Sequence, residues 1–311
     1  MAAHLSWDYD PSPRSRMLGL YERARKAQWD PATDIRWSAT VAFGSPLPDD
    51  SSFAMASFEA SPLAVGGRSM WDRFRWELQS WMVSQFLHGE QGALAASARL
   101  VETVPGLDAK YYLASQVADE ARHLEVFSRY LRDHVPDPYP PSASLITLLE
   151  HALADSRWDV TALGMHIMIE ALAMAAFRLA DGTFHDDLIR QIIRLAARDE
   201  ARHVSFGVLA LGDLYRELSH PERAEREEFV LEAAALIRRR FLLEDIWERL
   251  GVSREDGRAY ASHDVLMVKY RQAIFAKIVR SLDQIGLMTG RVRDGLGRLD
   301  LLGFGADRSL P

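Results

Sequence analysis

One pentapeptide, Asp-Glu-Ala-Arg-His, occurs twice in this chain, and its two copies lie eighty positions apart. The first copy covers residues 119–123 and the second covers residues 199–203. The same offset relates two further glutamates, Glu90 and Glu170, each of which stands thirty residues before the glutamate of its own pentapeptide. The chain therefore uses one unit twice: a glutamate followed, thirty residues later, by Glu-x-x-His.

This spacing has a simple meaning on helices. Residues three apart share one helix face, so the glutamate and the histidine of each pentapeptide point the same way. A step of thirty residues accommodates half a helix, a turn and half an antiparallel helix, which brings each leading glutamate level with its Glu-x-x-His. Ferritin-like di-metal carboxylate proteins gather their ligands in this way inside a four-helix bundle. The candidate metal ligands are Glu90, Glu120, His123, Glu170, Glu200 and His203.

The charge of these six residues indicates which metals they would hold. Four buried carboxylates without cations would repel one another and would be costly to desolvate, whereas two divalent cations neutralise them. Ligation rich in oxygen, with one imidazole per metal, suits iron or manganese better than a structural zinc site. The chain has no cysteine, which excludes disulfides, thiolate zinc sites and iron–sulfur clusters and fits a reducing cytoplasm.

The neighbours of the ligands suggest an outer layer of the site. An aspartate precedes the glutamate of each pentapeptide, at Asp119 and Asp199. Metal-bound imidazoles usually donate their second ring N–H to a carboxylate or carbonyl group. We expect each aspartate to accept this hydrogen bond from the histidine of the other half. Arg122 and Arg202 would pair with the aspartates and balance their charge.

Composition and periodicity predict an all-α protein. Hydrophobic residues make up 48% of the 311 residues, ample for a large core. We expect an irregular, partly helical segment over residues 1–70, a ferritin-like four-helix bundle over 71–218, and extra C-terminal helices over 219–311 that pack on the bundle. The individual helices are expected at 17–28, 71–102, 108–134, 144–179 with a bend near Ser156, 185–218, 223–250 and 260–287.

Several classes of partner and location are disfavoured. The net charge is −7 and the basic residues are scattered, so nucleic acid is not an expected partner. The amino terminus lacks the apolar core of a signal peptide. The most apolar stretch, residues 161–177, is interrupted by His166 and Glu170, and a membrane span needs roughly 20 predominantly apolar residues. We therefore expect a helix buried inside a cytoplasmic protein, without membrane contact.

The doubled Asp-Glu-x-Arg-His resembles the motif of the ferritin-like di-iron carboxylate oxygenases and oxidases. Bacterial multicomponent monooxygenase hydroxylases are nearest in motif, the ribonucleotide reductase small subunit is a relative, and the match covers roughly residues 71–218. The resemblance implies an iron pair, or manganese with iron, and dioxygen as co-substrate. It also implies a small-molecule substrate and an external electron donor such as a reductase or ferredoxin. Homodimers are common in these families.

Three positions depart from the patterns of these relatives. Radical-forming ribonucleotide reductases carry a tyrosine where this chain has Phe127, so a stored tyrosyl radical is not expected there. The monooxygenase hydroxylases carry a threonine where this chain has Met174. Aromatic-amine N-oxygenases carry a seventh ligand, a histidine, where this chain has Ala196. The subfamily therefore stays open at this point.

Residues within one or two helical turns of the ligands are candidates for a substrate or dioxygen cavity. Most are core residues on the simplest interpretation, and His166 is then a hydrogen-bonded core histidine. The candidates are Phe86, Ala93, Leu94, Ser97, Phe127, His166, Ala173, Met174, Phe177, Val204 and Gly207.

The leading functional hypothesis is an oxidoreductase that uses dioxygen to hydroxylate, N-oxygenate or desaturate a small organic substrate. One alternative is a ferroxidase that handles iron for storage or detoxification. Another is a ligand-binding oxidase similar to the ribonucleotide reductase small subunit, with a Mn/Fe site. The last is a bundle that uses metal only for stability.

Overall fold

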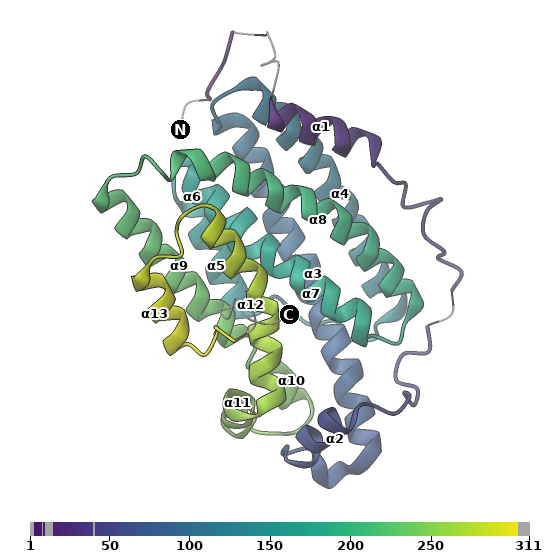
Figure 1. The fold of residues 1–311 in the computed structure, drawn as a ribbon. Helices are drawn as coiled ribbons and strands as arrows, with labels where there is room; N and C mark the ends of the chain where they lie inside the picture. Colours follow the sequence, from purple (N-terminus) through teal and green to yellow (C-terminus); the bar gives the residue numbers. More distant parts are fainter. Residues whose placement is uncertain (1–2, 8, 10–14, 40, 304–311) are drawn as a thin grey trace, which may run out of the picture.

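The computed structural model describes residues 3–7, 9, 15–39 and 41–303, and the regular structure in these residues is helical, without a strand (Figure 1). This confirms the predicted all-α class. Four long antiparallel segments form the central bundle. They are α3 (Gly67–Thr103), α4 (Leu107–His134), the continuous run α6 (Trp158–Ala162), η2 (Leu163–Glu170) and α7 (Ala171–Thr183), and α8 (Asp187–Leu214).

Local sequence signals explain where the bundle helices begin and end. Gly106 adopts a φ of 86°, a left-handed value that glycine tolerates, and so allows the tight turn between α3 and α4. The proline-rich run after His134 ends α4. Asp186 caps α8, because its carboxylate accepts hydrogen bonds from the backbone N–H groups of Leu188 (2.9 Å) and Ile189 (3.3 Å).

The third bundle segment is not a uniform helix. The predicted helix over 144–179 breaks around the predicted position, since α5 (Ala143–Ala154) ends just before Ser156 and α6 begins just after it. The eight residues of η2 then form a π-helix, in which the wider turn changes the direction of each side chain that follows. Sequence periodicity did not predict this π segment.

Further helices cover the bundle. α1 (Arg16–Lys26) lies across α4 and α8, and α2 (Ser52–Glu59) lies at the lower end of α3 in Figure 1. α9 (His220–Arg240) packs against α5 and η2, and α12 (Val265–Gln284) packs against α7. The remaining helices are η1 (Ala64–Gly66), α10 (Glu244–Arg249), α11 (Arg254–His263) and α13 (Gly290–Arg298).

The C-terminal helices differ from the prediction. The expected helix over 223–250 is divided, because the chain leaves α9 at Phe241 and Leu243 adopts a left-handed conformation with a φ of 59°. The expected helix over 260–287 is also divided, at Asp264, which caps α12 through its side chain. α13 was not predicted. Apolar side chains run through the first break, at Phe241–Leu243, so hydrophobic periodicity did not reveal it.

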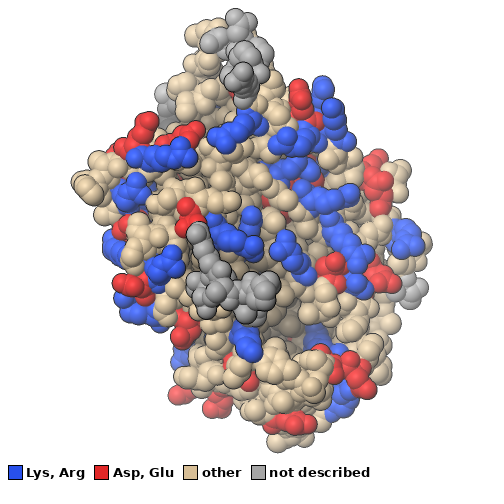
Figure 2. All heavy atoms as spheres, viewed as in Figure 1, with Lys and Arg blue, Asp and Glu red and all other residues tan. Residues whose placement is uncertain are grey.

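The apolar stretch identified in the sequence lies inside the molecule. The helical run Trp158–Thr183 is long and apolar enough to cross a membrane by length and composition alone, but 83% of its most apolar window is buried. On the surface, basic and acidic side chains are interspersed over most of the face drawn in Figure 2.

Candidate metal centre

Six side chains from the four bundle segments meet at one buried place. Their nitrogen and oxygen atoms form two overlapping groups, within each of which all the ligand atoms lie within 4.8 Å of one another. All six residues are at most 5% exposed. The first group is Glu90, Glu120, His123 and Glu200, and the second is Glu120, Glu170 and His203.

Two glutamates lie between the two imidazoles. One oxygen of Glu120 lies 3.2 Å from Nδ1 of His123, and its other oxygen lies 3.1 Å from Nδ1 of His203. In the same way, one oxygen of Glu200 lies 3.5 Å from Nδ1 of His123, and its other oxygen lies 3.5 Å from Nδ1 of His203. Glu120 and Glu200 could therefore bridge two metals, with an Nδ1 atom facing each metal.

The other imidazole nitrogens face the aspartates of the opposite half. Nε2 of His123 lies 3.2 Å from Asp199, and Nε2 of His203 lies 3.3 Å from Asp119. The structure thus brings the residues together in the crossed arrangement described above. An Nε2–H that donates to the aspartate leaves the lone pair of Nδ1 free for a metal.

The two arginines of the pentapeptides pair with the aspartates. Arg122 forms an ion pair with Asp119 on its own helix, and Arg202 does the same with Asp199. Arg202 also reaches to within 3.5 Å of Asp119. The aspartates are almost fully buried, so these arginines supply the positive charge that their burial requires.

The sequence interpretation missed the contribution of the N-terminal segment. Trp29, just beyond α1, donates its indole N–H to Asp199 at 2.8 Å, and its ring stacks on His123 with 6.3 Å between centroids. Gln28 donates to Asp119 at 3.2 Å. No motif marks these residues, because only the path of residues 15–39 across α4 and α8 brings them to the site.

A second unpredicted residue, Gln116, makes the two halves of the site different. Its amide nitrogen donates to Glu120 at 3.1 Å and to Glu170 at 2.9 Å, and its oxygen lies 3.1 Å from Nε2 of His166. Burial, followed by the charge of His203, lowers the pKa of His166 to about 3. His166 is therefore a neutral donor to Gln116. The position eighty residues after Gln116 is Ala196, which has no such group.

Burial dominates the titration of the glutamates. It raises the pKa of Glu90 and of Glu170 well above the usual range, and it also raises the pKa of Glu200. Burial acts in the same direction on Glu120, but His203 and His123 outweigh it and hold the pKa of Glu120 well below its usual value. Four charged carboxylates in this space therefore require compensating positive charge.

The cluster has the donor atoms that a metal pair requires. One oxygen each of Glu120, Glu170 and Glu200, together with Nδ1 of His203, is buried and lacks a hydrogen-bond partner within the described part of the chain. Such atoms are costly unless a cation or a proton satisfies them. The arrangement, with carboxylate oxygens in excess over two imidazole nitrogens, fits two ions of the iron or manganese type.

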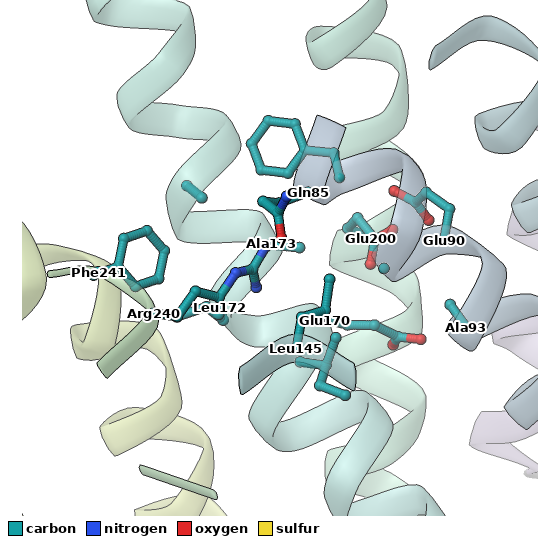
Figure 3. A pocket seen from close by; sticks show the side chains of 14 residues that line it. Gln85, Glu90, Ala93, Leu145, Glu170, Leu172, Ala173, Glu200, Arg240 and Phe241 are labelled. Carbon is teal, nitrogen blue, oxygen red and sulfur yellow. The ribbon is translucent and has the colours of Figure 1, made fainter. Parts of the chain in front are cut away.

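A cavity of about 40 Å³ adjoins the carboxylates (Figure 3). Three of the residues predicted to line a substrate or dioxygen cavity, Phe86, Ala93 and Ala173, line this cavity. The glutamates that line it are Glu90, Glu170 and Glu200, and it is otherwise lined by Gln85, Gly89, Leu145, Ile169, Leu172, Ala176, Arg240 and Phe241. Arg240 and Phe241 come from the C-terminal extension and were not predicted.

The other predicted cavity residues do not line this cavity. Phe127 and Phe177 pack against the ring of Phe86, and Gly207 lies directly against His166. Residues close to a ligand in the sequence need not face the cavity, because the residues of a single helical turn point in different directions. The residues absent from the cavity wall are Leu94, Ser97, Phe127, His166, Met174, Phe177, Val204 and Gly207.

Comparisons with known proteins agree with this fold. Residues 97–286 match the family model described as p-aminobenzoate N-oxygenase AurF, a stretch that includes every candidate ligand except Glu90. No curated protein matches the sequence. Among solved structures, a variant of an R2-like ligand-binding oxidase with an aerobically reconstituted Mn/Fe cofactor is 19% identical, with a TM-score of 0.59 over 87% of this chain and 93% of that chain. A second variant, with an anaerobically reconstituted Mn/Fe cofactor, is 18% identical, with a TM-score of 0.52 over 89% and 94%. These likenesses confirm the ferritin-like fold.

Proposed function

Because the chain belongs to the p-aminobenzoate N-oxygenase family, we propose that it is an oxidoreductase that uses two iron ions and dioxygen to oxidise a small organic substrate. The observation that carries the proposal is the position of Glu120 and Glu200, each with one oxygen toward each imidazole. A bundle stabilised by a single structural metal would not need two such carboxylates between two histidines.

The proposal assigns a role to each residue of the cluster. Glu90 and His123 would hold one iron, Glu170 and His203 would hold the other, and Glu120 and Glu200 would offer an oxygen to each. When bound, the iron pair supplies the electrons that activate dioxygen. The aspartates keep the proton on Nε2 of each imidazole, and the apolar walls of the cavity exclude water from the reaction.

The name of the family favours oxygen transfer to the nitrogen of an amine, with hydroxylation and desaturation as alternative outcomes. Ala196 stands where aromatic-amine N-oxygenases carry a seventh ligand, so the chain offers six protein ligands and a water or substrate could take the seventh position. An external reductase or ferredoxin would return electrons, since the chain has no cysteine for an iron–sulfur cluster. We further propose a cytoplasmic protein, with a homodimer as the assembly to test.

The decisive experiment counts metals. The protein is loaded anaerobically with ferrous iron, alone or with manganese, and the bound ions per chain are measured before and after exposure to dioxygen. We expect two ions per chain that are oxidised together. Mössbauer spectra of the oxidised, iron-loaded protein should then show an antiferromagnetically coupled pair. Glu120→Ala and Glu200→Ala should each lose at least one ion.

The matched control is Glu125→Ala, which removes an exposed glutamate from the same helix as Glu120. This variant should keep two ions. One ion or none in the natural protein, or the same metal content in all variants, would refute the di-metal proposal. Two ions that oxidise without any effect on candidate amines, acids or hydrocarbons would instead favour the ferroxidase alternative.

A further inference from the structure

The two halves of the metal centre differ in the number of donors that they offer. Within each half the ligand atoms lie within 4.8 Å of one another, so one ion can reach all of them. The affinity of a site for a divalent ion depends on how many charged ligands it has and how rigidly they are held. The two positions are therefore unequal. The four-donor position consists of Glu90, Glu120, His123 and Glu200, and the three-donor position consists of Glu120, Glu170 and His203.

The amide of Gln116 lies at the three-donor position. Its nitrogen donates to the oxygen of Glu120 that faces His203, at 3.1 Å, and to one oxygen of Glu170, at 2.9 Å. The second oxygen of Glu170 is buried and has no hydrogen-bond partner among the described residues, so it is available to a cation. In the other half the repeat places Ala196 at the corresponding position, and an alanine side chain has no donor.

His166 holds Gln116 in this orientation. The oxygen of the Gln116 amide lies 3.1 Å from Nε2 of His166, so each end of the amide has its own partner. His166 is fully buried, and its ring packs against Phe206 with 5.2 Å between centroids. On its other side lies Gly207, where a Cβ atom would overlap with His166. A histidine packed in this way keeps its place, and it therefore limits the rotation of the Gln116 side chain.

We propose that Gln116 positions Glu120 and Glu170 for the ion of the three-donor position, and that this position binds its ion more weakly than the four-donor position does. The inference rests on the proposed function and adds an order of filling, in which the four-donor position takes up its ion first. Two carboxylates close together repel each other, and an N–H donor shared between them stabilises both in the charged form. Without the amide, Glu120 and Glu170 lose the contact that keeps them together.

The test measures the two ions separately. Metal-free protein is titrated with Mn²⁺ under anaerobic conditions in a calorimeter, and we expect two separable dissociation constants for the natural protein. Gln116→Leu removes the amide and keeps a side chain of similar size. It should raise the weaker dissociation constant roughly 10–100-fold, the usual effect of losing a hydrogen-bond partner of a metal ligand, and leave the tighter one unchanged. His166→Leu, which frees the amide to rotate, should weaken the same ion by a smaller factor.

A second background identifies the position that Gln116 serves. Glu170→Ala removes the glutamate that belongs to the three-donor position alone, so one ion should remain, at the four-donor position. In this background, the further change Gln116→Leu should leave the dissociation constant of the remaining ion unchanged, because the ion that depends on the amide is already lost. A purely structural effect of Gln116→Leu would instead weaken the remaining ion as well.

The control is Gln91→Ala, which removes an exposed glutamine from α3 and should keep both dissociation constants. Equal affinities in the natural protein would overturn the inference, as would a Gln116→Leu variant that binds both ions normally or weakens both alike. Each of these results leaves two ions on the natural protein, whereas one ion or none there refutes the proposed function itself. Circular dichroism checks the folding of every variant. If Gln116→Leu does not fold, the natural protein and His166→Leu still decide the outcome.

Discussion

At the scale of single residues, the crossed histidine–aspartate pairs organise the site. Asp199 accepts from Nε2 of His123 and from the indole of Trp29, and the charge of Arg202 lies beside it. Burial by itself would raise the pKa of Asp199, but these contacts outweigh burial and lower the pKa to about 2. The carboxylate therefore stays ionised at neutral pH and holds His123 with Nδ1 free for a metal.

Replacement of Asp199 by asparagine should weaken metal binding without unfolding the protein. The amide keeps the shape but loses the charge that orients and polarises His123, and changes of this kind typically cost roughly 10–100-fold in metal affinity. Competition with a coloured chelator measures the affinity. Asp213→Asn, at the exposed end of the same helix, is the matched control and should bind metal as the natural protein does. Unchanged affinity in Asp199→Asn would exclude the role proposed for this aspartate.

At the scale of elements, the π-helix η2 positions Glu170 and brings three helices close together. Glu170 is the last residue of η2, so the wide turn determines where its carboxylate points. Gly164, the second residue of this segment, lies against α5 and α9. A Cβ atom there would lie 2.7 Å from the Cβ of Ala152 and 3.0 Å from the ring of Phe229. Only glycine permits this approach without movement of the neighbouring helices.

Gly164→Ala should therefore destabilise the protein. We expect a loss of about 1–3 kcal/mol in the free energy of unfolding, because overpacking in a dense core forces backbone shifts. Gly182→Ala is the control: it lies near the end of α7 with open space around its Cβ, and it should be neutral or stabilise by up to about 1 kcal/mol. Urea unfolding measures both variants. A transition of Gly164→Ala at the same urea concentration as the natural protein would contradict the close packing described.

At the scale of the whole molecule, metal binding and stability are linked. The six candidate ligands come from four bundle segments spread over more than a hundred residues, and they meet only in the folded chain. A cation that binds this arrangement and not the unfolded chain stabilises the fold according to its concentration relative to its dissociation constant. Buried carboxylates left without cations oppose folding unless they take up protons.

Removal of metal should consequently lower the melting temperature. We expect the midpoint of the metal-free protein to fall by several degrees and to rise again with added ferrous iron under anaerobic conditions; a hundredfold excess over the dissociation constant corresponds to about 2.7 kcal/mol. Differential scanning calorimetry measures this shift. The variant Glu120→Ala should lose most of it, and Glu125→Ala should keep it. A midpoint that does not depend on metal in the natural protein would show that the ions do not bind this cluster.

The sequence by itself determined the fold class and the candidate ligands. Helical periodicity and turn residues depend on local interactions, so helices α3, α4 and α8 were predicted to within a few residues at most ends. The repeated spacing of Glu90, Glu120, Glu170 and Glu200 predicted a four-helix bundle. Residues three apart share a helix face, and a step of thirty residues brings ligands on antiparallel helices to the same level.

Only the tertiary structure decided which other residues reach the site. Trp29, Gln116 and Arg240 lie in three different segments, and no local pattern sets them apart from other buried or surface residues. The turn at Leu243 directs Arg240 and Phe241 to the cavity, and the π-helix η2 sets the direction of Glu170. These features depend on packing between segments distant in the sequence, and local propensities do not encode such packing.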